Sequence, residues 1–144
     1  MPRIVAEYQD RQRIVFTARD RSMVNVRTLR EDGPVGFNST ELLLIALANC
    51  SLGTLLNHPL LLDREVMRCE AMFNAEMQQN PSKVASVIGV IDLVVTDPAL
   101  LAHTAELEAA ACTCPMCNTI SEATPIRTEI RMRLGAIDLV PSPA

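Results

Sequence analysis

The chain has 144 residues, of which 49% are hydrophobic and 21% are charged, a composition that predicts one ordinary globular domain and excludes a disordered chain. The formal net charge is −4, and aromatic residues make up only 3%. Duplex binding requires a concentrated positive surface and single-strand binding requires aromatic stacking, so no nucleic-acid partner is expected.

The chain begins with three short stretches in which apolar and polar residues partly alternate. They lie at 3–9, 12–19 and 22–29, and each is expected to form a strand. The following stretch, 30–39, is rich in Gly, Pro, Asp and Asn and is expected to be a loop. The first positions carry charges where a signal peptide would be apolar, so we expect a cytoplasmic protein.

A long apolar helix is predicted from Thr40 to the helix breaker at 57–59. Ser39 or Thr40 is a suitable N-cap, and Glu41 places a negative charge in the first turn, where it favours the helix dipole. The helix is apolar on nearly all sides, which is typical of a helix buried inside a domain or an assembly. Its apolar run, 42–56, is too short and too interrupted to predict a membrane span.

The second half of the chain predicts two strands, an amphipathic helix and a last strand, at 65–78, 84–95, 97–114 and 125–135. The first of these strands is expected to be long, with one irregularity, and to include Val66, Cys69 or Arg68, Met72 and Met77. The last strand alternates strictly, with Ile126, Thr128, Ile130 and Met132 on one face. The element order βββ–α–ββ–α–β therefore predicts one α+β domain over residues 1–144, without repeats or a linker.

The five cysteines are the main chemical signal. In a reducing compartment they indicate metal binding or redox chemistry rather than a framework of structural disulfides. Three of them, Cys112, Cys114 and Cys117, lie in the stretch ACTCPMC. Cys50 lies in the middle of the long apolar helix, and Cys69, alone in an alternating strand, is expected to be a packing residue.

Several interpretations of the cysteine cluster remain open from the residues alone. Three thiolates with His58, His103 or Cys50 could hold zinc. Tetrahedral zinc sites usually combine two cysteine motifs that are far apart in the sequence, and this chain has one such motif, so no metal site is predicted. A thioredoxin-like CxxC would follow a strand and open a helix, whereas the sequence places this motif behind a helix. Unreactive packing is the simpler interpretation of Cys50 by itself, although a helical thiol that faces the cluster could form a reversible disulfide.

Two segments resemble the signatures of a known family. FNSTELLLIALANCS, residues 37–51, and CPMCNTI, residues 114–120, resemble the two cysteine motifs of the OsmC/Ohr family of osmotically inducible and organic hydroperoxide resistance proteins. The resemblance implies an OsmC-like fold, with two antiparallel sheets wrapping long central helices in an intertwined homodimer. It would explain a helix that is apolar on every side.

The resemblance also implies a mechanism. Cys50 matches the cysteine that attacks a hydroperoxide and becomes a sulfenic acid, and Cys114 matches the cysteine that resolves it as a disulfide. An external dithiol, lipoyl-type in better-known members, restores the pair, and no cofactor is needed. A catalytic arginine is expected from the N-terminal strands, with Arg19, Arg21 and Arg27 as candidates.

Three departures from the family pattern stand out. The catalytic Glu of the hydroperoxide reductases falls one position before Glu41, where this chain has Thr40, and their Pro falls at Ser39. The stretch STELLL resembles the broader OsmC-like branch instead, and Glu41 is expected to be a weaker charge-setting partner. Cys112 and Cys117 lie outside the two-cysteine pattern.

The leading hypothesis is therefore a cytoplasmic, homodimeric, thiol-dependent peroxidase whose substrates are small-molecule hydroperoxides. One alternative is a non-catalytic OsmC-like protein, a small-molecule binder or a redox sensor that uses Cys50. The other is a zinc-stabilised structural domain built on the 112–117 cluster. A lowered pKa of Cys50 would favour the enzyme, and tight stoichiometric metal would favour the structural domain.

Overall fold

The computed structural model describes residues 1–27 and 36–135, and the expected loop at 30–39 and the end of the strand expected at 22–29 lie partly outside these ranges. The chain forms two compact units, Met1–Leu43 and Leu44–Ala144. Each is described by itself, and the expected single domain over the whole chain stays a prediction.

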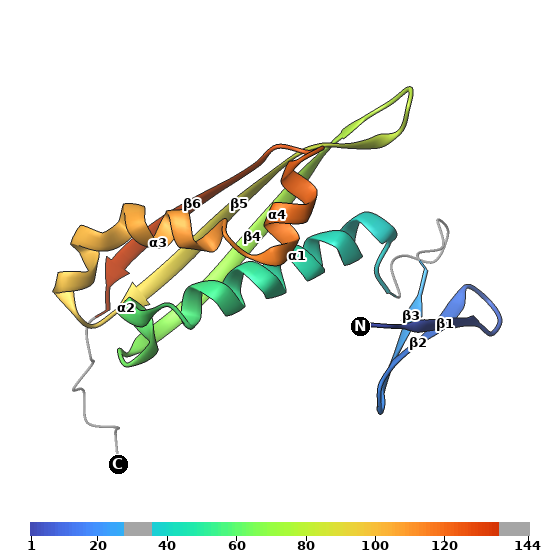
Figure 1. Ribbon diagram of the computed structural model, residues 1–144, viewed down its shortest axis with the longest axis horizontal. Coiled ribbons are helices and arrows are strands. Elements are labelled where there is room, and N and C mark those ends of the chain that lie inside the picture. The colour runs from blue at the N-terminus through green and yellow to red at the C-terminus, as the bar shows by residue number, and fades with distance from the viewer. Residues whose placement is uncertain (28–35, 136–144) are drawn as a thin grey trace, which may run out of the picture. The chain divides into compact units, whose positions relative to one another are not determined.

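The first unit contains an antiparallel sheet in the order β1-β2-β3. Its strands are β1 (Val5–Tyr8), β2 (Arg13–Ala18) and β3 (Arg21–Val26), coloured blue in Figure 1. Neighbouring strands are joined by tight turns, in which Arg11, Gln12 and Arg19 have positive φ angles. The three strands expected from the alternating pattern are thus confirmed.

Helix α1 (Ser39–Leu56) begins one residue earlier than predicted. The Glu41 N–H donates to Asn38 Oδ1 at 2.8 Å, and the Asn38 N–H donates to Glu41 Oε2 at 3.0 Å. This reciprocal pair is a capping box, and it satisfies two N–H groups that the helix cannot pair internally. The prediction of Ser39 or Thr40 as the N-cap is therefore wrong, because Glu41 reaches back to Asn38 from the third helical position.

The second unit contains a mixed sheet in the order β4-β5-β6, built from β4 (Val66–Gln78), β5 (Lys83–Val95) and β6 (Ile126–Leu134). The strands β4 and β5 form a long antiparallel hairpin, as expected, whereas β6 runs parallel to β5. The expectation of two antiparallel sheets is thus wrong for this sheet. The helical connection between β5 and β6 carries the chain back to the end where β5 begins, and such a crossover produces parallel pairing.

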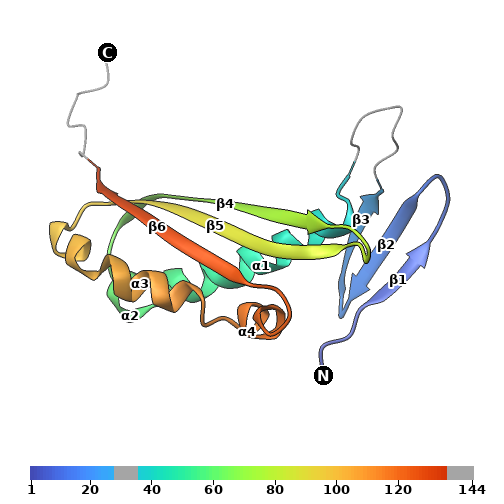
Figure 2. The ribbon, with the colours of Figure 1, turned by 90° about the horizontal axis from the view of Figure 1, so that it is seen from above.

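Helices cover one face of this sheet, with α3 (Thr104–Ala111), α4 (Pro115–Ser121) and the α1 segment from Leu44 onward on the same side (Figures 1 and 2). A short α2 (Pro59–Leu62) and a 3-10 helix η1 (Pro98–His103) complete the unit.

The helix predicted over 97–114 is divided into η1 and α3, and α4 begins separately. Pro115 disfavours helical geometry for the residue before it, and Cys114 is accordingly extended, with φ −69° and ψ 154°.

Two groups of buried side chains fill the space between sheet and helices. The first, called the aliphatic cluster here, consists of Leu55, Leu61, Ile91, Leu93, Val95, Leu100, Leu107, Ala111 and Ile130. The second, called the thiol cluster, has Leu47, Val87, Cys114 and Cys117 at its centre, and Cys50 and Cys112 pack against it.

Strand patterns largely match the predicted faces. The alternation of β6 is confirmed, with Thr128 and Ile130 buried and the arginines exposed. The long strand predicted at 65–78 is confirmed as β4, in which Met72 and Met77 are 60% and 46% exposed. One irregularity was predicted in it, and the register shifts twice, between Val66 and Arg68 and between Glu76 and Met77.

Helix α1 exposes most of its apolar surface in the single chain. Its three buried residues, Leu47, Ser51 and Leu55, are spaced four apart and form one line. The helix is long and apolar enough to cross a membrane, with a mean hydropathy of 1.5, and 17% of it is buried. The chain therefore does not bury the helix by itself, which leaves the assembly as the predicted reason for its apolar character.

Candidate active site

The fold brings together two cysteines that are far apart in the sequence. Cys50 lies in the second half of α1, and Cys114 is the N-cap residue of α4. Cys50 packs against the thiol cluster that contains Cys114, and all five cysteines are free thiols. The pairing of Cys50 with the cysteine cluster is therefore possible without unfolding the protein.

Cys114 is the most deeply buried thiol of the group. Its side chain is 1% exposed, and its Sγ accepts the Cys117 N–H at 3.3 Å and lies 3.7 Å from Ser51 Oγ. Burial raises the pKa of Cys114, but hydrogen bonds from the Cys117 backbone and from Cys50, Ser51 and Cys117 side chains outweigh it, so the pKa is lowered. The surroundings of Cys114 therefore favour its ionised form.

Cys50 has the opposite character, because it is partly exposed and its pKa is raised. A hydrogen bond with the Met116 backbone lowers the pKa, whereas burial and the neighbouring Cys114 thiolate raise it more strongly. The expectation of a lowered Cys50 pKa is thus not met in the single chain. The pair combines an accessible thiol with a buried thiolate, and a proton can pass between the two.

Ser51 was missed by the sequence reasoning. It is fully buried, and its hydroxyl contacts Cys114 Sγ at 3.7 Å and Cys117 Sγ at 4.0 Å. The signal was available in the sequence, because Ser51 is the polar member of the line Leu47, Ser51 and Leu55, and a buried hydroxyl needs a partner.

The CPMC motif opens a helix after all. Cys114 is the N-cap of α4, Pro115 is its first residue, and Cys117 lies one turn later. The prediction that the motif merely follows a helix is therefore incomplete, since α3 ends at Ala111 and α4 starts anew. Burial, followed by the neighbouring Cys114 charge, raises the pKa of Cys117 to about 12, so its thiol is protonated at rest.

The predicted charged partners lie in the first unit. Arg19 occupies the turn between β2 and β3, Arg21 is the first residue of β3, and Arg27 follows that strand. The Glu41 carboxylate accepts the Asn38 N–H in the capping box. The proposed roles of these four residues toward the thiols stay predictions.

The histidines have structural partners. The Leu60 N–H donates to His58 Nδ1 at 3.2 Å at the start of α2, and His103 Nδ1 lies 3.1 Å from Glu106 Oε2. Within residues 1–27 and 36–135, no group of three or more His, Cys, Asp or Glu side chains is placed to hold a metal ion. The placement of these side chains gives no support to the zinc alternative.

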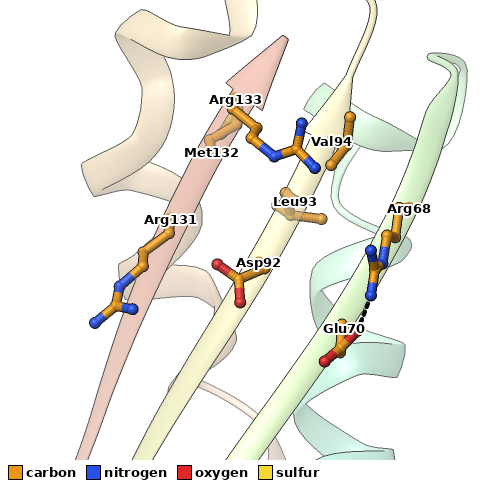
Figure 3. Close-up of a pocket in the computed structure, with 8 residues that line it drawn as sticks. All are labelled: Arg68, Glu70, Asp92, Leu93, Val94, Arg131, Met132 and Arg133. Carbon is orange, nitrogen blue, oxygen red and sulfur yellow. Dashed lines mark hydrogen bonds and ion pairs between the residues drawn. The ribbon is translucent and has the colours of Figure 1, made fainter. Parts of the chain in front are cut away.

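A hollow lined by charged side chains lies on the face of the β4-β5-β6 sheet that the helices do not cover (Figure 3). It has a volume of about 220 Å³ and is lined mainly by Arg68, Glu70, Asp92, Arg131 and Arg133. Arg68 pairs with Glu70, and Asp92 lies between Glu70 and Arg131 on the neighbouring strands, so charges of both signs line the hollow. This surface is a solvated charged face without a nucleophile, so the thiol cluster is the candidate active site.

Comparisons with known proteins address the fold. No protein-family model matches the chain, and no curated protein sequence does. A solved OsmC-like protein of unknown function from Vibrio cholerae superposes with a TM-score of 0.74 at 14% identity, over 91% of this chain and 99% of that one. The chain has the OsmC-like fold.

Two further structures extend this likeness. An OsmC-like protein from Mycoplasma pneumoniae has a TM-score of 0.70 at 13% identity and covers 94% of this chain and 98% of its own. The organic hydroperoxide resistance protein OhrB of Bacillus subtilis has a TM-score of 0.63 at 18% identity, covering 91% and 98%. The OsmC-like fold predicted from the two cysteine motifs is thus confirmed.

Proposed function

We propose that this OsmC-like protein is a thiol-dependent peroxidase that reduces organic hydroperoxides. Cys50 is the nucleophile, and Cys114 is the resolving cysteine. The observation that carries the proposal is the packing of Cys50 of α1 against the thiol cluster that contains Cys114 of α4. The name of its structural neighbour, an organic hydroperoxide resistance protein, supports the substrate class.

In the first step, Cys50 attacks the peroxide and Cys114 accepts the proton of Cys50. Cys50 is partly exposed and can meet a peroxide, whereas Cys114 is buried and holds the negative charge. The Cys114 thiolate accepts the Cys50 proton, and the Cys50 thiolate attacks the peroxide oxygen and breaks the O–O bond. The alkoxide leaves and takes up the proton, so the products are a Cys50 sulfenic acid and an alcohol.

The second step forms the disulfide. The Cys114 thiolate attacks the Cys50 sulfur, the S–O bond breaks, and hydroxide leaves as water after protonation. An external dithiol, of lipoyl type in our proposal, then reduces the disulfide by two thiol exchanges and becomes a disulfide itself. Peroxide reduction and dithiol oxidation thus balance in each cycle.

The remaining parts of the proposal concern charge and assembly. Arg19 or Arg21 stabilises the reacting thiolate, with Glu41 as a weaker charge-setting partner. The protein works as a homodimer, which is supported by the exposed apolar side chains on α1, Ile45 and Leu56 among them. Five free thiols suit a reducing compartment, so we place the protein in the cytoplasm.

The decisive test is Cys50→Ser, assayed by hydroperoxide consumption with a dithiol as reductant. We expect a loss on the order of a thousandfold, because the nucleophile is gone while the fold is preserved. Cys69→Ser is the matched control, since Cys69 is a partly buried thiol of the aliphatic cluster, and it should retain activity. Undiminished turnover in Cys50→Ser would remove the assignment.

A second candidate function is a redox sensor without efficient turnover. The raised pKa of Cys50 favours it, because a protonated thiol reacts slowly with peroxide. The two functions differ in the presence of excess dithiol, where a peroxidase consumes many equivalents of peroxide per chain. A sensor is oxidised once and is then reduced too slowly to sustain consumption.

A further inference from the structure

Three thiols of the candidate site lie in series, with Cys114 in the middle. Cys114 and Cys117 lie together at the centre of the thiol cluster, where the Cys117 N–H donates to Cys114 Sγ, and Cys50 of α1 packs against the same cluster. A two-cysteine peroxidase needs only Cys50 and Cys114. The contact with Cys117 joins Cys114 to another buried thiol that the proposed function does not use.

The geometry at the start of α4 suits a second disulfide. Cys117 N–H donates to Cys114 Sγ at 3.3 Å, and Ser51 Oγ lies 3.7 Å and 4.0 Å from the two sulfurs, so both face the same hydroxyl. Residues three apart on a helix have Cβ atoms about 5–6 Å from each other, and disulfides need about 3.5–4.5 Å. A small movement of the first turn is therefore enough to join the pair.

We propose that Cys117 is a third redox-active cysteine, which takes over the disulfide from Cys50. Cys117 attacks Cys114 Sγ, the Cys50–Cys114 bond breaks, and a Cys114–Cys117 bond forms. Cys50 leaves as a thiolate and takes up the proton that Cys117 gives up, so the exchange needs no further oxidant or reductant. The inference rests on the proposed peroxidase function, because peroxide supplies the first disulfide.

The charge on Cys114 determines when Cys117 can act as a nucleophile. The Cys114 thiolate is one of the charges that keep Cys117 protonated at rest, together with burial. Once Cys114 is part of a disulfide, this charge is gone and Cys117 ionises more readily. Cys117 therefore becomes a better nucleophile only after Cys50 has been oxidised.

The exchange has a measurable consequence for stoichiometry. Both Cys114 and Cys117 are buried, 1% and 2% exposed, so the final disulfide is shielded, whereas Cys50 regains a reactive thiol. Without reductant, a chain that makes the exchange consumes a second equivalent of peroxide and ends with a sulfenic acid on Cys50. A chain that cannot make the exchange stops after one equivalent.

The experiment adds an excess of organic hydroperoxide to the full chain without reductant, in the presence of dimedone to trap sulfenic acid. A Cys112→Ala background ensures that an intrapeptide disulfide in the 112–117 segment joins Cys114 to Cys117. Non-reducing peptide mapping should find that disulfide with a dimedone adduct on Cys50, and consumption of two equivalents. Adding Cys117→Ala, or Cys117→Ser as a second variant, should halve consumption and leave a Cys50–Cys114 disulfide without adduct.

Other outcomes distinguish the two proposals. A persistent Cys50–Cys114 disulfide with Cys117 present overturns the exchange but leaves the peroxidase intact. A Cys114–Cys117 disulfide that forms equally fast in Cys50→Ser overturns the order of steps, because Cys50 would not be the entry point. If neither disulfide forms and no peroxide is consumed, the proposed function itself fails. Cys69→Ala serves as the control and should behave like its parent.

Discussion

The two buried clusters of the helix-covered sheet differ in chemistry although the same β5 contributes to both. The aliphatic cluster contains Ile91, Leu93 and Val95 of β5, and all of its buried residues are Leu, Ile, Val or Ala. The thiol cluster contains Val87 of the same strand, but two of its four central residues are cysteines. One end of the unit therefore serves packing, and the other combines packing with ionisable groups.

Cys69 and Cys114 illustrate how the two clusters differ in their effect on a thiol. Cys69 packs against the aliphatic cluster, and burial there raises the pKa of its thiol. Cys114 is more deeply buried, yet its pKa is lowered because several donors surround its sulfur. Burial alone thus raises the pKa of a thiol, whereas hydrogen bonds to the sulfur within a buried site lower it.

The largest effect is expected from breaking the aliphatic cluster. Leu107 is completely buried, and Leu107→Ala should reduce the free energy of unfolding by about 2–5 kcal/mol, through lost burial and a cavity. Denaturant unfolding measures the loss, and thiolate absorbance near 240 nm follows the cysteines. A changed thiolate titration in the folded variant would show that the two clusters are not independent.

A smaller effect is expected from alkaline pH acting on the thiol cluster. The pKa of Cys117 is raised from 9.0 to about 12, so between these pH values the unfolded chain releases a proton that the folded chain keeps. The contribution is fully present below pH 9 and is lost as pH rises, by up to about 1.4 kcal/mol per pH unit.

The check is urea unfolding at several pH values. Cys117→Ala should flatten the alkaline decline in stability, because it removes the group with the largest raised pKa. Cys69→Ala is the matched control from the aliphatic cluster and should flatten the decline less. Equal slopes in the parent and Cys117→Ala would contradict the assigned pKa.

The smallest effect is expected from removing the Ser51 hydroxyl. Ser51→Ala removes one of the donors to Cys114, so the Cys114 pKa should rise. The thiolate would then be lost at a higher pH as the solution is acidified, and thiolate absorbance measures this midpoint. Thr54→Ala removes a hydroxyl from the same helix and should leave the midpoint in place, whereas an unmoved midpoint in Ser51→Ala would remove Ser51 from the site.

Much of this protein could be predicted from local patterns. The strict alternation of β6 and the apolar character of α1 identify those elements, because side-chain periodicity follows directly from backbone geometry. The CPMC motif and the helix around Cys50 identified the OsmC-like fold through resemblance, which the solved structures confirm.

The misses have local physical causes. The sequence predicted one irregularity in β4, whereas the structure has two register shifts, because the second shift, between Glu76 and Met77, depends on the pairing with β5. The parallel pairing of β6 depends on how far the intervening helices carry the chain, which strand sequences do not encode.

By itself, the sequence determined which residues can do chemistry and which periods the elements follow. Only the tertiary structure decided how the thiols differ, because a pKa depends on the atoms around a sulfur and not on its neighbours in the chain. Cys114 lies among Cys50, Ser51 and Cys117 and its pKa is lowered, whereas the pKa of Cys69 in an alternating strand is raised. The spacing of residues 50 and 114 in the sequence carries no such information, since the packing of Cys50 against the thiol cluster arises only in the fold.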